Sequence, residues 1–125
     1  MEQLKTFFFD TYAFYEIIVG NSNYEKYKKD VVIITTKLNL MELHYGLLRT
    51  EGKEKADEKY DSYIQFAVEI TDPIVKMANE FRLQNKEKKL SYVDCLGYTL
   101  AKSYNVRFLT GDMQFENMEN VEFVK

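Results

Sequence analysis

The sequence predicts an α/β protein with a central parallel sheet of four to five strands and helices on both faces. Four short β-rich runs, at residues 6–10, 31–35, 106–110 and 121–125, alternate with polar or helix-like segments. The first three runs are almost continuously apolar, which is typical of strands that are buried on both faces. The segments between them have the length and period of the helices that connect parallel strands.

Five helices are expected, at residues 11–20, 37–49, 54–70, 71–86 and 91–105. Gly20 is a plausible stop for the first helix, and Pro73 fits the first turn of the fourth. In the second helix, apolar residues at steps of three and four form one stripe, made of Leu38, Met41, Tyr45 and Leu48. Residues 85–91 form a short basic connection before the last helix.

The composition indicates one folded domain over residues 1–125. A chain of 125 residues buries roughly two thirds of the surface that its unfolded form exposes, and one core is enough for it. The chain is 46% hydrophobic, with five glycines and one proline, which argues against disorder. Its net charge of −3 gives no bulk attraction for nucleic acid, so any nucleic-acid site must be a local patch.

We expect a cytoplasmic protein with no membrane partner. The lone cysteine, Cys95, cannot form an internal disulfide, and residues 1–10 lack a basic region followed by a long apolar stretch. No apolar run approaches the roughly 20 residues that are needed to cross a bilayer.

Four acids follow strand ends or lie in adjoining helices. Asp10 is expected to end the first strand, and Asp112 follows the third strand by two residues, so parallel strands bring both to the same edge of the sheet. Glu42 lies in an apolar part of the second helix, and Asp94 lies in the first turn of the last one. Nearby glycines, Gly46 and Gly97, are expected to leave open space above these two carboxylates.

Each acid also has a simpler explanation. Asp10 is a suitable N-cap for the helix that begins at Thr11, and Asp112 suits an Asx-turn. Asp94 completes a capping box with Ser91, and Glu42 fits a solvated helix position. One shared cation site accounts for all four acids together, and we favour it over four separate explanations.

Such a site suits Mg²⁺ or Mn²⁺, because its ligands are carboxylate oxygens without cysteine or histidine. Without a cation, carboxylates so close together repel one another, and at least one should have a raised pKa. Ions in such sites activate water and stabilise the charge that develops on a phosphodiester, so the predicted chemistry is phosphoryl transfer.

The chain resembles the PIN-domain ribonucleases and, among them, the VapC-type toxins of toxin–antitoxin pairs. The best match is the C-terminal third, "LSYVDCLGYTLAKSYNVRFLTGDMQFENMENVEFV", with its acidic helix start and "T-x-D-x-x-F" turn. "FFFDTYAFYE" is similar to the family's first strand and acid, and "NLMELHYGLLR" to its glutamate-bearing helix. The resemblance implies a single PIN-like domain with a three-layer sandwich.

The resemblance also implies roles for individual residues. Asp10, Glu42 and Asp94 match the three acids that hold the metal in the family, and Asp112 matches a fourth, more variable acid. Thr110 matches a hydroxyl residue that helps to order the catalytic site, and Thr11 matches the small hydroxyl residue after the first acid. We therefore expect Mg²⁺- or Mn²⁺-dependent cleavage of RNA by a toxin that dimerises and binds a cognate antitoxin.

Further residues are candidates for binding. Thr11 and three lysines before the Asp94 helix, Lys86, Lys88 and Lys89, are candidates for contacting RNA. The bulky "YAFYE" after Asp10 departs from the family's smaller side chains, and we expect a partner surface from aromatic residues of the early helices: Tyr12, Phe14, Tyr15, Tyr60 and Tyr63. Two alternatives remain open: a PIN nuclease of RNA processing or quality control, and a noncatalytic RNA-binding module.

Overall fold

A single parallel sheet organises the protein, whose computed structural model describes residues 3–125. The sheet has four strands in the order β2-β1-β3-β4, and every neighbouring pair is parallel. The strands are β1 (Lys5–Phe9), β2 (Val31–Ile34), β3 (Arg107–Thr110) and β4 (Val121–Phe123). The predicted parallel sheet is therefore confirmed, with four strands.

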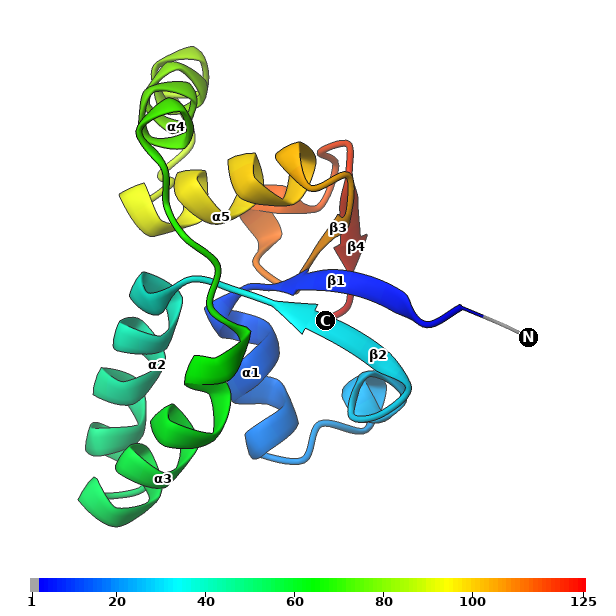
Figure 1. Cartoon of the computed structure of the whole chain (residues 1–125), viewed down its shortest axis with the longest axis vertical. Helices are drawn as coiled ribbons and strands as arrows, with labels where there is room; N and C mark the ends of the chain where they lie inside the picture. The colour runs from blue at the N-terminus through cyan, green and yellow to red at the C-terminus, as the bar shows by residue number, and fades with distance from the viewer. Residues whose placement is uncertain (1–2) are drawn as a thin grey trace.

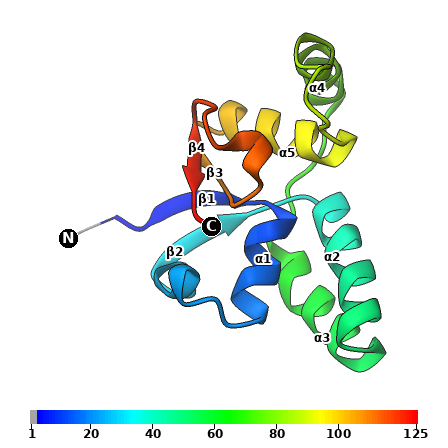
Figure 2. The same ribbon diagram turned by 180° about the vertical axis from the view of Figure 1, so that it is seen from behind.

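Helices cover both faces of this sheet (Figures 1 and 2), so the predicted three-layer arrangement is confirmed. They are α1 (Thr11–Ile18), α2 (Lys37–Thr50), α3 (Lys53–Tyr63), α4 (Asp72–Gln84) and α5 (Tyr92–Ser103). Short 3-10 turns are η1 (Ser22–Tyr27), η2 (Ile64–Phe66) and η3 (Met113–Phe115). None of the helices within residues 3–125 has the length and apolar character of a membrane span.

The phenylalanine run of β1 explains the two cores. Successive side chains of a strand point to opposite faces. Phe7 and Phe9 therefore pack with α1, α2 and α3, whereas Phe8 packs with α4 and α5. On the second face, the rings of Phe8 and Phe108 stack with their centroids 5.6 Å apart. An apolar run without alternation is thus what a strand between two helical layers requires.

The segment after α3 differs from the expectation. The predicted helix at 54–70 ends at Tyr63, and the chain continues through η2 into an extended stretch. Thr35, just after β2, donates its N–H to the Phe66 carbonyl and accepts the N–H of Val68 at 2.8 Å. The apolar second half of this segment therefore continues the hydrogen bonding of the sheet edge, a long-range contact that local pattern cannot reveal.

The apolar stripe that was expected on α2 lies largely in solvent. The core-facing residues are instead Leu40, Leu43 and Leu47. Met41 is 57% exposed and Tyr45 is 64% exposed. Both sets recur at steps of three and four, so periodicity alone did not identify the buried face. The helix consequently presents apolar side chains on two sides.

The strand order places a topological switch point at the carboxyl ends of β1 and β3. From β1 the chain enters α1, which packs on the Phe7 and Phe9 face. From β3 it enters η3, whose Phe115 packs on the opposite face with Phe8. Adjacent parallel strands whose following segments leave to opposite faces form the usual ligand crevice of an open α/β sheet.

Candidate metal and active site

Asp10 lies at this switch point, between the end of β1 and the start of α1. It follows β1 by one residue, rather than ending the strand as expected, and serves as the N-cap of α1. Its carboxylate accepts the N–H of Thr11 at 2.9 Å and the hydroxyl of Thr110 at 2.7 Å. The residue is only 4% exposed. The capping hydrogen bond is therefore present. Capping alone does not require burial, because a capping aspartate can do the same at the protein surface, so the burial of the Asp10 carboxyl group needs a further explanation.

A tight turn after β3 brings Asp112 towards Asp10. The Thr110 hydroxyl, which donates to Asp10, accepts the N–H of Asp112 at 3.1 Å. The Asp112 carboxylate in turn accepts the N–H of Gln114 at 3.0 Å, as in an Asx-turn. Between them, a Cβ on Gly111 would lie 2.3 Å from the Tyr12 ring, so only glycine allows this close passage. Thr110 thus connects the two aspartates.

Glu42 is held by a buried polar network between α1 and α2. The Thr11 hydroxyl donates to the Glu42 carboxylate at 2.8 Å. The Asn39 side-chain amide donates to Thr11 Oγ1 at 3.2 Å, and Thr36 donates to the Asn39 amide oxygen at 2.6 Å. Asn39 and Thr36 are fully buried. The sequence interpretation missed both residues, although a threonine cap three positions before an asparagine was a visible signal.

Asp94 reaches the same region from the start of α5. Ser91 and Asp94 form the predicted capping box, with bonds of 2.9 and 3.0 Å. The expectation that Gly97 opens space above Asp94 is wrong, because a Cβ there would lie 2.9 Å from the Phe8 ring. Gly97 instead lets α5 lie directly on the aromatic core. At Gly46, beside Glu42, a Cβ would meet nothing within 4 Å.

Burial and mutual repulsion raise the pKa values of Asp10, Glu42 and Asp94. Burial, with smaller contributions from the charges of Asp94 and Glu42, outweighs the hydrogen bonds from Thr110 and Thr11 and raises the pKa of Asp10 to about 7. Burial, together with the charge of Asp94, also raises the pKa of Glu42. The pKa of Asp94 is raised by burial and by Asp112. These pairwise couplings indicate that the four acids lie near one another.

The carboxylate oxygens suit a hard divalent ion, although the acids do not form a complete set of metal ligands by themselves. Within residues 3–125, no group of three or more acidic, histidine or cysteine side chains is placed so that it could hold a metal ion as it stands. Mg²⁺ typically binds through one or two carboxylates and retains several waters, so a preformed cluster is not required. Three of the four acids keep one carboxylate oxygen without a hydrogen bond among the described residues: Glu42 Oε2, Asp94 Oδ1 and Asp112 Oδ2. The residues therefore fit an ion whose shell is completed by water.

The candidate RNA-binding lysines lie outside the acid cluster. Lys86, Lys88 and Lys89 belong to the connection between α4 and α5 and line a separate pocket beside Ser91. Lys88 Nζ lies 3.4 Å from the Gln114 carbonyl, in η3. Thr11, the other candidate for contacting RNA, already donates its hydroxyl hydrogen to the Glu42 carboxylate.

The expected aromatic partner surface is wrong for Phe14, which is only 1% exposed and belongs to the core. The remaining candidates are partly buried and pack against the same core: Tyr12, Tyr15, Tyr60 and Tyr63. The bulky residues after Asp10 therefore fill the space between α1 and its neighbours. Exposed apolar side chains are found instead on α2, at Met41, Tyr45 and Leu48.

Cys95 is not a nucleophile in this site. Its side chain is buried, and burial beside Asp94 raises the pKa of the thiol to about 11. The thiolate needed for nucleophilic attack is therefore disfavoured at neutral pH. His44 Nε2 donates to the Asp57 carboxylate at 2.7 Å and so belongs to the contact between α2 and α3.

Fold and site together define an α/β protein with a carboxylate crevice at the switch point of a four-stranded parallel sheet. The family model of the PIN domain matches residues 7–121. This chain belongs to the PIN domain family, as the resemblance predicted.

Solved structures share this fold over nearly the whole chain. The VapC20 toxin of Mycobacterium tuberculosis, described as cleaving the Sarcin-Ricin loop, superposes with a TM-score of 0.79 at 18% identity, covering 95% of this chain and 99% of that one. VapBC2 of Rickettsia felis, bound to a promoter DNA fragment, gives 0.72 at 21% identity, covering 96% and 99%. DNA-bound VapBC of Salmonella typhimurium gives 0.72 at 17% identity, covering 95% and 96%. A search of the curated proteins found no significant match.

Proposed function

We propose that this protein is a metal-dependent endoribonuclease that acts in the cytoplasm as the toxin of a toxin–antitoxin pair. The observation that carries the proposal is the convergence of four acids on the β1–β3 crevice, with Asp10 fully buried among them. Membership of the PIN domain family supports it, as do structural neighbours that include a toxin described as cleaving the Sarcin-Ricin loop.

In this proposal, Asp10, Glu42 and Asp94 would hold Mg²⁺ or Mn²⁺, and Asp112 would be a fourth ligand on the β3 side. A bound ion supplies activation of a water molecule and stabilisation of charge on the phosphodiester oxygens. Thr110 orients Asp10 and the Asp112 turn through its two hydrogen bonds. Thr11 orients Glu42 in the same way.

The electrostatics favour cation binding. A carboxyl group with a pKa of about 7 retains its proton in about half of the molecules at neutral pH. A divalent ion relieves the repulsion that Asp94 and Glu42 exert on Asp10. Binding therefore displaces a proton, and affinity should rise with pH across neutrality.

The partner proposed for the exposed side of α2 is a segment of the cognate antitoxin. Met41, Tyr45 and Leu48 are each at least 40% exposed and occupy successive turns of the helix. Several structural neighbours are toxin–antitoxin complexes. A charge introduced by Tyr45→Glu should abolish neutralisation by the antitoxin and leave RNA cleavage intact. The homodimer is a separate proposal, and it is contradicted if the purified protein remains monomeric at all concentrations tested.

Cleavage of mixed cellular RNAs, with Mn²⁺ or with a chelator, tests the enzymatic proposal. Wild-type protein should cut RNA only with the metal, and Asp94→Asn should lose the activity. Asp72→Asn is the matched control. Asp72, like Asp94, lies in the first turn of a helix, but its helix is α4, at the end that is farther along the chain from α5. Cleavage that survives chelation, or that Asp94→Asn leaves undiminished, contradicts the mechanism. Growth arrest on expression separates a toxin from an RNA-processing nuclease.

A further inference from the structure

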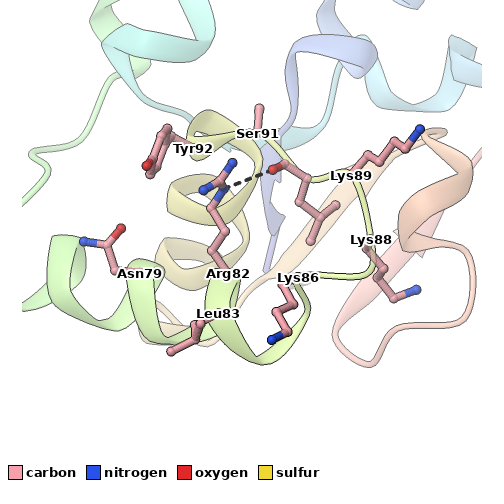
Figure 3. Close-up of a pocket in the computed structure, with 9 residues that line it drawn as sticks. Asn79, Arg82, Leu83, Lys86, Lys88, Lys89, Ser91 and Tyr92 are labelled. Atoms are coloured by element: carbon pink, nitrogen blue, oxygen red, sulfur yellow. Dashed lines mark hydrogen bonds between the residues drawn. The ribbon is translucent and has the colours of Figure 1, made fainter.

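A basic pocket of about 570 Å³ lies between the end of α4 and the start of α5 (Figure 3). Six of the side chains that line it have a charged, hydroxyl or aromatic group: Arg82, Lys86, Lys88, Lys89, Ser91 and Tyr92. The pocket lies outside the carboxylate crevice and contributes no ligand to the proposed metal site. It therefore needs an explanation of its own.

Arg82 and Tyr92 form an ordered platform at one side of this pocket. The guanidinium carbon of Arg82 lies 4.2 Å from the centre of the Tyr92 ring, within the range of a cation–π contact. Arg82 Nε also donates to the Leu90 carbonyl at 3.2 Å, which fixes the plane of the guanidinium group (Figure 3). Tyr92 nevertheless remains 63% exposed. Aromatic rings and arginine planes of this kind are the surfaces on which unpaired nucleobases stack.

The charge of the pocket contrasts with that of the whole chain. Residues 82–89 hold four basic residues against one acid, Glu87, whereas the net charge of the protein is −3. Among residues 3–125, none of these four cations forms an ion pair. Figure 3 shows the lysines spread along the connection, with Lys88 and Lys89 extending away from Arg82. Such a spread suits the successive phosphates of an extended strand.

Ser91 connects this pocket to the proposed active site. It lines the pocket and also exchanges two hydrogen bonds with Asp94 across the first turn of α5. On the other side of the connection, Lys88 contacts the Gln114 carbonyl, two residues beyond Asp112. A strand that leaves the pocket past Ser91 therefore arrives at the acids.

We propose that the pocket is a subsite for single-stranded RNA, in which one nucleobase stacks on the Arg82–Tyr92 pair and the lysines bind the flanking phosphates. The subsite rests on the proposed function in that it positions the phosphodiester to be cleaved beside Asp94. The lysines alone fit an acidic peptide equally well, but a flat platform of tyrosine and arginine favours a base. An acidic peptide is therefore treated as an outcome of the test.

Binding is measured without metal, so that cleavage does not interfere, by fluorescence anisotropy of a labelled single-stranded RNA of about 12 nucleotides. Tyr92→Ala should weaken binding about tenfold, the loss expected for one stacked base, and Tyr92→Phe should retain it. Tyr104→Ala is the matched control, because Tyr104 is an exposed tyrosine at the other end of α5. An abasic ribose-phosphate oligomer of the same length should bind wild type and Tyr92→Ala equally.

The lysines are tested by the salt dependence of binding. Joint replacement of Lys86, Lys88 and Lys89 by glutamine should lower the slope of log affinity against log salt by about 2, at roughly 0.7 per phosphate contact. The matched control is the same replacement at Lys26, Lys28 and Lys29, a second lysine run remote in sequence. Tyr92→Ala should leave the slope unchanged.

Three results overturn the subsite: unchanged affinity in Tyr92→Ala, an equal loss for the abasic oligomer, or tighter binding of a polyglutamate peptide that does not depend on Tyr92. Failure of the proposed function looks different. In that case RNA binds in a Tyr92-dependent manner, yet no cleavage follows when Mn²⁺ is added. Conversely, if the protein cleaves RNA and Tyr92→Ala does not change the KM, the proposed nuclease function is supported and the proposed subsite is contradicted.

Discussion

Replacing Asp10 by asparagine is expected to stabilise the metal-free protein at alkaline pH and to have the opposite effect when a divalent ion is present. The carboxyl group of Asp10 is buried beside Asp94 and Glu42, and its pKa is raised from 3.8 to about 7. The folded state therefore holds the proton more tightly than the unfolded state does. The stability linked to this proton is fully present below about pH 4 and is lost as the pH rises through about 7.

The magnitude follows from the size of the shift. A difference of about three pKa units at 1.36 kcal/mol each corresponds to about 4 kcal/mol, which the wild-type protein lacks above about pH 8. Asparagine is neutral at every pH, so the variant avoids this loss. It weakens the contact with the Thr110 hydroxyl, at a cost of about 1–2 kcal/mol. The expected net gain for Asp10→Asn is therefore about 2–3 kcal/mol without metal.

Urea unfolding at about pH 4 and about pH 8.5, with a chelator and then with Mn²⁺, measures this effect. Asp10→Asn should be more stable than wild type only at the higher pH without metal, and Mn²⁺ should stabilise wild type but not the variant. Asp61→Asn, an exposed aspartate of α3, is the control and should follow wild type throughout. An equal change at both pH values would refute the reasoning.

Two further substitutions test the packing and the polar network. Gly97→Ala should destabilise the protein by about 1–3 kcal/mol, because its Cβ would lie 2.9–3.1 Å from the Phe8 and Phe108 rings; thermal unfolding measures this, and an unchanged midpoint contradicts the close packing. Thr110→Val should cost about 1–3 kcal/mol by removing the hydrogen bond to buried Asp10, and it should raise the Asp10 pKa further. A ¹³C NMR titration of the aspartate carboxyl groups checks the second effect, and a lower Asp10 pKa in the variant contradicts the role of Thr110.

Much of the fold was predictable because it depends on short apolar runs and on the acids at their ends. The phenylalanine run before Asp10 indicated a strand covered on both faces, and its alternate rings do enter two separate cores. Parallel strands then place whatever follows β1 and β3 at one edge of the sheet. The positions of Asp10 and Asp112 at that edge follow from these two facts.

The parts that were not predictable depend on contacts between distant segments. Two apolar sets recur with helical period on α2, and only packing against the sheet decides that Leu40 is buried while Met41 is exposed. The extended stretch after α3 is fixed by Thr35, which is remote in sequence. Asn39 matters because it meets Thr11, 28 residues away, and a local pattern contains no such information.

Titration of Mn²⁺ into the purified protein, followed by the electron paramagnetic resonance signal of the free ion, tests the shared cation site most directly. Wild-type protein should bind Mn²⁺ at a saturable site. Asp10→Asn and Glu42→Gln should each weaken binding at least about tenfold, whereas Asp61→Asn should not change it. The absence of a saturable site in wild type, or equal affinity in all the variants, would show that the four acids have structural roles only.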